Sequence, residues 1–312
     1  MRINHFSKNN IVTERKRQDY GNTLIILGNG FDTDLGFNLS FKAYSNCHLN
    51  PTCGLSTWHD YENYLRDKIL KWVASDQSEQ TAKDINEEWQ AFTSNFSYFF
   101  TKNTSDLSVI NSTSNAYTIL ENLTKKSSIY TFNYTYPFEY VAIPFKGTNY
   151  QFVHGRYYRD TFDKLLMVMS QHHNMIVGID CDKIPDVVKV NEYLQPLIKQ
   201  LHSSYQPTNL SKDLIQSETV VFFGFSLGIV DYDYFADFFN SIINGNSVCK
   251  QIFIITYNNG SLSDMEFELK KQNLSFSQLN KFVEILPIFN ENDSTKTLTE
   301  KSDNFKKLLS FI

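Results

Sequence analysis

Seven short runs of apolar, β-branched and aromatic residues constrain the fold of this chain more than any other feature of its sequence. The runs are continuous rather than alternating, which is typical of strands covered on both faces in a parallel sheet. They cover residues 23–27, 129–132, 150–153, 175–177, 219–223, 251–256 and 282–288. Helical patterns lie between many of them, for example at 231–243 and 303–311. Strands that alternate with helices predict a Rossmann-like, doubly wound α/β fold with a mainly parallel sheet.

The stretch between the first and second runs, roughly 40–126, shows no convincing strand pattern. Its large apolar residues recur at helical spacing. They are Trp58, Tyr61, Tyr64, Leu65, Trp89, Phe92, Phe96 and Phe99. We therefore expect a helical insertion over the carboxyl edge of the sheet, with these side chains mainly in its core. The insertion belongs to a single expected domain at 23–312, preceded by a polar arm at 1–22 that lacks the apolar segment of a secretory signal.

The composition favours a soluble, cytoplasmic protein. The chain has 312 residues, of which 41% are hydrophobic, enough to bury a full core. Its 29 Lys and Arg against 34 Asp and Glu give a net charge of −5, which argues against a broad nucleic-acid surface. The longest mainly apolar run, 220–230, is far shorter than the roughly 20 residues of a membrane helix. We therefore expect neither nucleic acid nor a membrane as a partner.

The cysteines favour reduced thiols over a disulfide framework. The chain has four of them, Cys47, Cys53, Cys181 and Cys249. Their spacing matches no disulfide scaffold, as is usual for cytoplasmic proteins. The first two lie near His48 and His59, but this cluster matches no zinc motif. We expect no metal site there.

Glycine is scarce, yet it gathers where strands are predicted to end. Of 12 glycines, seven follow predicted strands, namely Gly28, Gly30, Gly36, Gly155, Gly178, Gly224 and Gly228. Open α/β sheets bind ligands at this edge, because the loops after the strands converge there. Tight strand-to-helix turns also require glycine without any ligand. The concentration of glycine predicts a nucleotide-like ligand between the turns at 28–32, 154–155 and 224–231.

The first of these turns is not the dinucleotide fingerprint. It begins Gly28-Asn29-Gly30, but the third glycine of that motif falls on Thr33. A carboxylate at Asp32 disfavours a nearby pyrophosphate and suits ribose hydroxyls or a cationic ring. Asp32 could instead cap the following helix. We assign Gly28, Asn29, Gly30 and Asp32 to ligand binding.

Two further strand ends carry polar side chains suited to catalysis. Asn133 offers both a donor and an acceptor, which can hold a water or a ribose hydroxyl. The imidazole of a histidine has an unperturbed pKa of about 6.5 as a residue type, so His154 is a natural candidate for a base near neutral pH. Either residue could also be structural, but their place beside the glycine turns favours catalytic roles for both.

The last turn fits the letters of a hydrolase nucleophile elbow. It reads Gly224-Phe225-Ser226-Leu227-Gly228. In that fold the histidine follows the serine, whereas His154 precedes Ser226, so we exclude the elbow. We assign Gly224, Ser226 and the nearby Asp231 to ligand binding.

The order of these motifs resembles that of the AbiH phage abortive-infection family. The matching segments are Gly28-Asn29-Gly30-Phe31-Asp32, Ser40-Phe41-Lys42, Thr131-Phe132-Asn133-Tyr134-Thr135, His154-Gly155, Val177-Gly178-Ile179-Asp180, Gly224-Phe225-Ser226-Leu227-Gly228 and Asp231-Tyr232-Asp233-Tyr234-Phe235. The chain has Phe225 where the family often has His. The resemblance implies antiphage defence by an activity restrained in the resting cell. A phage-derived trigger and self-association as a homo-oligomer are its candidate controls.

The same turns are more distantly similar to those of sirtuin-like NAD-consuming domains. That pattern usually has an acidic residue two positions after the asparagine, where this chain has Thr135. The zinc-binding cysteine quartet of deacylating sirtuins is absent. The likeness therefore implies hydrolysis of NAD+ to nicotinamide and ADP-ribose, with NAD as the substrate and no separate cofactor.

Hydrolysis of NAD+ at this site would give a role to six of its residues. Asn133 would position the attacking water or a ribose hydroxyl, and His154 would accept the proton. Ser226 and the amides of Gly28 and Gly30 would hold phosphate or the other ribose. Asp32 would face the positive charge that develops on the sugar.

Two other functions stay open at this point. Four aspartates could hold Mg²⁺ in a nuclease or phosphohydrolase, namely Asp32, Asp34, Asp231 and Asp233. Alternatively, the protein is a sensor that binds a nucleotide without turnover.

Overall fold

The computed structural model describes residues 23–46, 55, 58–157, 174–180, 184–203, 205–228, 231–293, 296–297 and 299–312. The expected arm at 1–22 lies outside these ranges. So do three members of the cysteine–histidine cluster, Cys47, His48 and Cys53.

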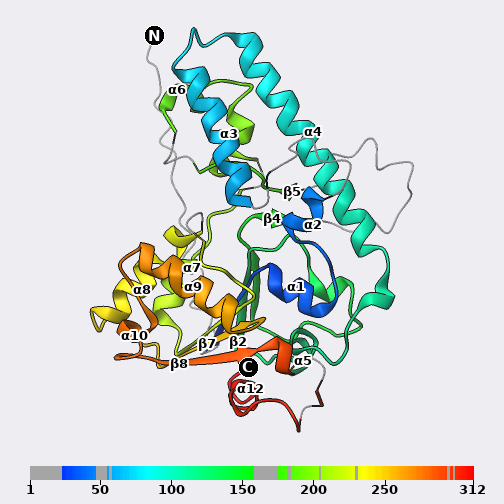
Figure 1. The fold of residues 1–312 in the computed structure, drawn as a ribbon, viewed down its shortest axis with the longest axis vertical. Helices are drawn as coiled ribbons and strands as arrows, with labels where there is room; N and C mark the ends of the chain where they lie inside the picture. Colours follow the sequence, from blue (N-terminus) through cyan, green and yellow to red (C-terminus); the bar gives the residue numbers. More distant parts are fainter. Residues whose placement is uncertain are drawn as a thin grey trace, which may run out of the picture.

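A six-stranded, all-parallel sheet forms the centre of the structure, which confirms the doubly wound α/β fold (Figure 1). Its strands are β1 (Thr23–Leu27), β2 (Ser127–Thr131), β3 (Asn149–Phe152), β6 (Thr219–Phe223), β7 (Gln251–Thr256) and β8 (Glu284–Phe289). They are ordered β3-β2-β1-β6-β7-β8. The chain thus builds outward from β1 in one direction and then, from β6, in the other. This is the order of dinucleotide-binding sheets, in which ligands bind where the order reverses.

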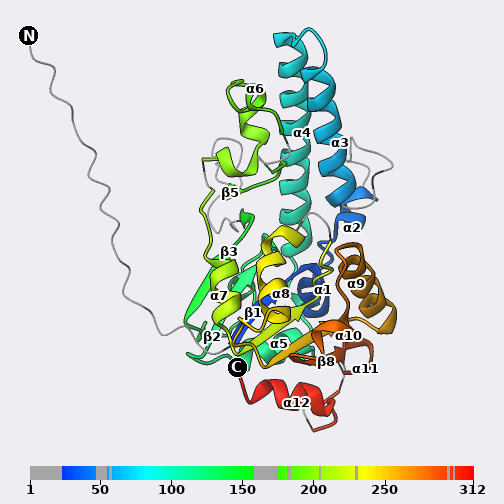
Figure 2. The same cartoon turned by 90° about the vertical axis from the view of Figure 1, so that its left-hand side faces the viewer.

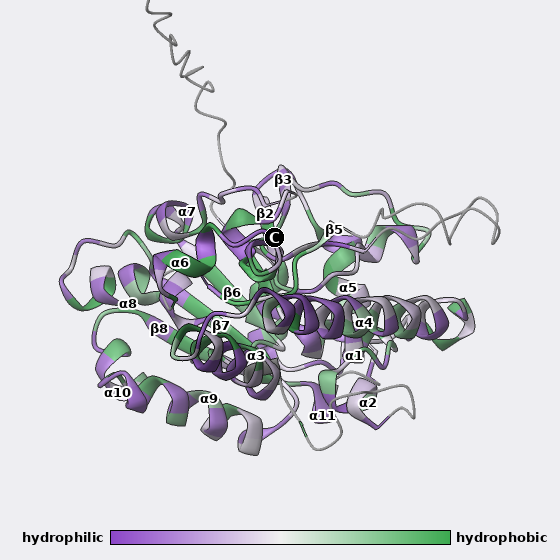
Figure 3. Cartoon of the chain, turned by 90° about the horizontal axis from the view of Figure 1, so that it is seen from above, coloured by the Kyte–Doolittle hydropathy of each residue, from purple (hydrophilic) through white to green (hydrophobic). Residues whose placement is uncertain are grey.

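Alternate residues of each central strand enter two different cores, as the pleat requires. In β1, Ile25 and Leu27 join one core, whereas Leu24 and Ile26 join the other. The first core includes α1 (Asn29–Leu35), α5 (Asn115–Asn122) and α12 (Asp303–Leu309). The second includes α7 (Leu210–Gln216), α8 (Ala236–Ile243), α9 (Asn259–Lys271) and α10 (Phe276–Leu279). The strands are hydrophobic between helices with polar outer faces (Figure 3), which explains why the apolar runs are continuous.

One predicted strand lies outside this sheet. Residues 175–177 contribute only Met175 to β5 (Asn174–Met175), which pairs antiparallel with β4 (Gly155–Arg156). Val177 continues as buried irregular chain, and its carbonyl accepts a hydrogen bond from Trp89 Nε1 at 2.8 Å. A short apolar run predicts that a segment is buried, but it does not predict whether the segment is a strand or irregular chain.

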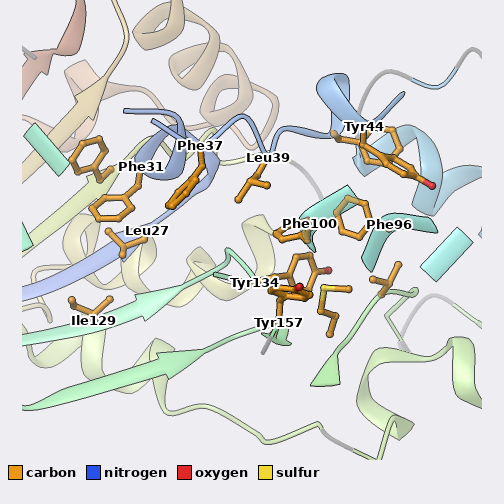
Figure 4. Close-up of a cluster of buried hydrophobic side chains, with 14 of the residues drawn as sticks. Leu27, Phe31, Phe37, Leu39, Tyr44, Phe96, Phe100, Ile129, Tyr134 and Tyr157 are labelled. Atoms are coloured by element: carbon orange, nitrogen blue, oxygen red, sulfur yellow. The ribbon is translucent and has the colours of Figure 1, made fainter. Parts of the chain in front are cut away.

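The insertion after β1 is helical, as predicted. It comprises α2 (Phe41–Ser45), α3 (Trp58–Val73), α4 (Glu79–Thr104) and the 3-10 turn η1 (Leu107–Val109), and it leads into α5. The long helices α3 and α4 rise side by side above the sheet (Figures 1 and 2). Aromatic side chains of α3 and α4 belong to a core that continues down to the strands. Figure 4 shows Phe96 and Phe100 of α4 in this core. The rings of Tyr61 and Phe92 stack with their centroids 3.7 Å apart.

A second segment packs against this insertion. It contains α6 (Asp186–Lys189) and the 3-10 turns η4 (Gln195–Leu197) and η5 (Lys199–Leu201). The remaining elements are η2 (Pro137–Glu139), η6 (Tyr232–Tyr234) and α11 (Asn290–Asp293). The helix expected from Asp231 therefore begins later, at Ala236, because a 3-10 turn precedes it. Within the described ranges, no helix has the length and apolar character needed to cross a membrane.

Candidate functional site

A cavity of about 460 Å³ lies at the carboxyl edge of the sheet, within the usual range for small-molecule sites. Its floor comes from the loops that follow β1, β2, β3 and β6. Its cover comes from α2, α3, α4 and η5. The structure brings all nine predicted site residues to this cavity, namely Gly28, Asn29, Gly30, Asp32, Asn133, His154, Gly224, Ser226 and Asp231.

The glycines of the floor allow two turns to pack backbone against backbone. A Cβ built at Gly28 would lie 2.5 Å from the carbonyl oxygen of Gly224. One built at Gly224 would lie 2.3 Å from Cα of Gly30, and Gly224 also has a positive φ of 59°. The close packing of the turns after β1 and β6 therefore requires glycine at these positions, whether or not a ligand is bound.

The amides of the first turn are already used within the protein. Gly28 N–H donates to the carbonyl of Phe223 at 2.9 Å, and Gly30 N–H donates to that of Gly224 at 3.0 Å. The expectation that these two amides hold a phosphate does not fit this geometry.

Asp32 is a buried carboxyl group inside helix α1, not its N-cap. The N-cap is Gly28, so the capping alternative for Asp32 is wrong. Its Oδ2 accepts a hydrogen bond from the hydroxyl of Thr135 at 2.6 Å, while Oδ1 has no partner among the residues that the structure describes. Burial raises the pKa of Asp32 to about 7, although Thr135 and Asn133 act in the opposite direction. Asp32 therefore titrates near neutral pH.

Asn133 joins the turn after β2 to the turn after β1. Its Nδ2 donates to the carbonyl of Gly28 at 2.9 Å, and its backbone N–H donates to the hydroxyl of Thr131 at 3.0 Å. A carboxamide has two amide hydrogens and a carbonyl oxygen. Asn133 therefore retains hydrogen-bonding capacity for a ligand while it holds the floor of the cavity together.

His154, after β3, and Asp231, after β6, form a pair that lines the cavity. Nε2 of His154 lies 3.2 Å from Oδ1 of Asp231, and their side chains are 12% and 26% exposed. The imidazole also packs edge-on against Phe132, with ring centroids 5.3 Å apart. A carboxylate in this position orients the imidazole ring, which suits a general base. The sequence assigned Asp231 only to ligand binding, and this pairing was not predicted.

The cover contributes a buried ion pair that the sequence analysis missed. Nζ of Lys199 lies 2.6 Å from Oε1 of Glu62, and the Lys199 side chain is 4% exposed. Burial by itself lowers the pKa of Lys199, but the carboxylates of Glu62, Asp180 and Asp231 raise it above its ordinary value. Burial raises the pKa of Glu62, and Lys199 opposes that shift. Neither residue belongs to a motif, and a charged residue on an amphipathic helix ordinarily indicates a solvated face.

Aromatic side chains supply much of the remaining wall. They are Phe41, Phe96, Phe100, Phe132, Tyr134 and Phe225. Phe96 was expected in the core. Phe96 and Phe100 both belong to the core (Figure 4), and both also line the cavity. Phe225 packs on Phe132 with ring centroids 4.6 Å apart. Such walls exclude water and strengthen the electrostatic interactions inside.

The four aspartates proposed for Mg²⁺ do not gather at one point. Asp32 and Asp231 line the cavity, whereas Asp34 accepts a hydrogen bond from the backbone of Ala116 at 2.8 Å, at the start of α5. Asp233 is not among the lining residues. Within the part of the chain that the structure describes, no three His, Cys, Asp or Glu side chains form a metal-binding group.

The structure is that of a doubly wound α/β protein with a ligand-sized cavity at the switch point of its sheet. Comparisons with models of known protein families, with curated proteins and with solved structures found no match.

Proposed function

We propose that this cavity binds NAD+ and hydrolyses the bond between its ribose C1′ and nicotinamide. The observation that supports this most is that the His154–Asp231 pair and Asn133 line one cavity at the switch point of a dinucleotide-type sheet. Attack of water on a sugar carbon needs a general base and an amide that positions the water. An aromatic wall that excludes bulk water strengthens the electrostatic interactions of both groups.

The proposed reaction consumes one water. The bond from C1′ to the pyridinium nitrogen breaks, and its electron pair leaves with nicotinamide, which becomes neutral and needs no general acid. The sugar passes through an oxocarbenium-like transition state. Water forms the new bond to C1′ and loses a proton to His154, and Asp231 stabilises the resulting imidazolium. The products are nicotinamide, ADP-ribose and a proton.

In the cell, we propose that this activity serves antiphage defence in the cytoplasm. Support for this part comes from the order of the motifs, which resembles that of the AbiH family. Depletion of NAD+ would stop the infected cell, so the activity must be restrained until infection. A phage-derived trigger and self-association are the proposed controls.

The test is release of nicotinamide from NAD+ by purified protein, with and without lysate from phage-infected cells. His154→Ala should lower the rate by about 10²–10⁴-fold, because the proton acceptor is removed. Asn133→Ala should lower it as well. His202→Ala and Asn304→Ala are matched controls, because neither residue lines the cavity and Asn304 also donates to a backbone carbonyl. Both controls should retain the parental rate.

Other outcomes would select other functions. Parental activity in a folded His154→Ala protein would exclude the proposed role of this histidine. Cleavage of nucleic acid that stops on chelation, with NAD+ intact, would select the metal-dependent nuclease. Tight binding of NAD+ without release of nicotinamide would select the sensor.

A further inference from the structure

One carboxyl oxygen of Asp32 is buried without a hydrogen-bond partner at the edge of the cavity. The residue is 2% exposed and lines the cavity. Thr135 holds Oδ2, while Oδ1 has no partner among the described residues. An unsatisfied buried carboxyl oxygen costs free energy, so its presence in a ligand-sized cavity indicates a function. A ligand hydroxyl that reaches Oδ1 would supply its missing hydrogen bond.

The surroundings of Asp32 disfavour a phosphate. A phosphate-binding turn presents free backbone amides, but those of Gly28 and Gly30 donate to carbonyls of the neighbouring turn. The carboxyl group of Asp32 repels an anion whenever it is ionised. A group with hydrogen-bond donors and no negative charge fits this position better.

Asn133 supplies a second contact point beside Asp32. Its carboxamide is close enough to act on the pKa of the Asp32 carboxyl group, and one of its amide hydrogens is used by Gly28. The pair therefore offers an acceptor on Asp32 and both donor and acceptor capacity on Asn133. Two adjacent hydroxyl groups, each able to donate and to accept, match this combination.

A nucleotide that places its ribose at Asp32 and Asn133 needs another partner for its phosphate. The cover of the cavity provides a cation for this group. Lys42 of α2 lines the cavity, is exposed, and forms no ion pair with any described residue. The other lysine at the cavity, Lys199, is already paired with Glu62. Lys42 is therefore the better placed of the two for an anionic group at the solvent side.

We propose that the turn after β1 binds the vicinal hydroxyls of a ribose through Asp32 Oδ1 and Asn133, and that Lys42 binds the phosphate of the same ligand. The site thus selects ribosides over deoxyribosides. The inference rests on the proposed function for the choice of a nicotinamide ligand, but the hydroxyl contacts apply to any ribonucleoside that fits.

The test measures Kd by calorimetry for nicotinamide riboside, its 5′-phosphate, adenosine and 2′-deoxyadenosine. Asp32→Ala should raise the Kd of the three ribosides about tenfold, the usual effect of losing a hydrogen bond to a charged group. Thr135→Val should also weaken all three, because Oδ2 is no longer held, and it serves if Asp32→Ala does not fold. Lys42→Met should weaken only the 5′-phosphate, with Lys102→Met, an exposed lysine of α4, as its matched control.

Three results would overturn the inference. In the first, a folded Asp32→Ala protein binds the ribosides as tightly as the wild type. In the second, Asp32→Ala tightens the 5′-phosphate relative to nicotinamide riboside, which places the phosphate at the first turn. In the third, wild type binds none of the ribosides, or binds 2′-deoxyadenosine as tightly as adenosine. If NAD+ is not hydrolysed while adenosine still depends on Asp32 and its 2′-hydroxyl, the hydrolase proposal is wrong and this inference stands.

Discussion

The carboxyl group of Asp32 is buried. The fold accommodates it there because the hydroxyl of Thr135 donates a hydrogen bond to one of its oxygens. The sirtuin-like pattern has an acidic residue at the position of Thr135, two after Asn133. In the structure the Thr135 hydroxyl instead contacts the carboxyl group of Asp32 at 2.6 Å. The carboxyl group at this place belongs to α1, and the hydroxyl that it accepts from belongs to the turn after β2. Thr135 and Asp32, far apart in the sequence, therefore form one hydrogen-bonded pair.

The raised pKa of Asp32 predicts a pH-dependent effect on stability. Its folded pKa of about 7 lies above the ordinary value of 3.8, so the folded state retains a proton that the unfolded chain loses. The stability from this group is present below pH 3.8 and is lost as the pH rises through 7. Asp32→Asn cannot ionise, and it should raise the free energy of unfolding at pH 8 by on the order of 4 kcal/mol, with little effect at pH 4.

Urea unfolding of both proteins at the two pH values measures this difference. Asp264→Asn is the control, because Asp264 is exposed on α9. Its effect should be the same at both pH values. An Asp32→Asn effect that does not change with pH would contradict the prediction.

Among the elements, the turns after β1 and β6 decide the shape of the cavity floor. Gly28, Gly30 and Gly224 interlock at distances that leave no room for a side chain. The turn after β2 is attached to them through Asn133 and the carbonyl of Gly28. Three strand ends that are far apart in the sequence thus form one continuous surface.

Gly224→Ala should therefore destabilise the protein severely. Its Cβ would lie 2.3 Å from Cα of Gly30, and its φ of 59° disfavours any side chain. We expect a loss of about 3 kcal/mol or more. Gly245→Ala is the matched control, because Gly245 has a similar φ of 69° but nothing within 4 Å of its Cβ.

The control isolates the cost of backbone strain, which we expect to be about 1 kcal/mol. Thermal or denaturant unfolding of both variants gives the difference. Equal losses in the two variants would mean that the contact between the turns contributes nothing.

For the whole molecule, the cavity depends on two segments that cover the sheet edge. The insertion carries Glu62 on α3, and the later segment carries Lys199 on η5. Their ion pair joins the two segments directly above the floor. Trp89 adds a second link through the carbonyl of Val177.

Removal of one partner of the Glu62–Lys199 pair should lower the free energy of unfolding much more than removal of both. Lys199→Met leaves the carboxylate of Glu62 buried and uncompensated, which typically costs about 3–5 kcal/mol. The double variant Glu62→Gln, Lys199→Met should recover most of that loss. Lys307→Met breaks an exposed pair with Glu284 and should cost less than about 1 kcal/mol. Urea unfolding compares the three, and a Lys199→Met loss as small as that of Lys307→Met would contradict the prediction.

Local patterns in the sequence determined the fold class and much of the sheet. The runs at 23–27, 219–223 and 251–256 match strands residue for residue, because buried parallel strands require continuous apolar residues. The same patterns predicted that nine site residues lie close together, because the carboxyl ends of parallel strands meet at one edge of the sheet. In the structure all nine line one cavity.

Only the tertiary structure decided which groups these residues contact in the cavity. It showed that the amides of Gly28 and Gly30 are occupied, that Asp231 pairs with His154, and that Asp32 retains an unpartnered oxygen. It also revealed Glu62 and Lys199, which no motif marks. Each of these facts is a contact between segments far apart in the chain. The sequence determines which groups end a strand, but the partner of each group depends on how the strands are ordered and on which segments cover their ends.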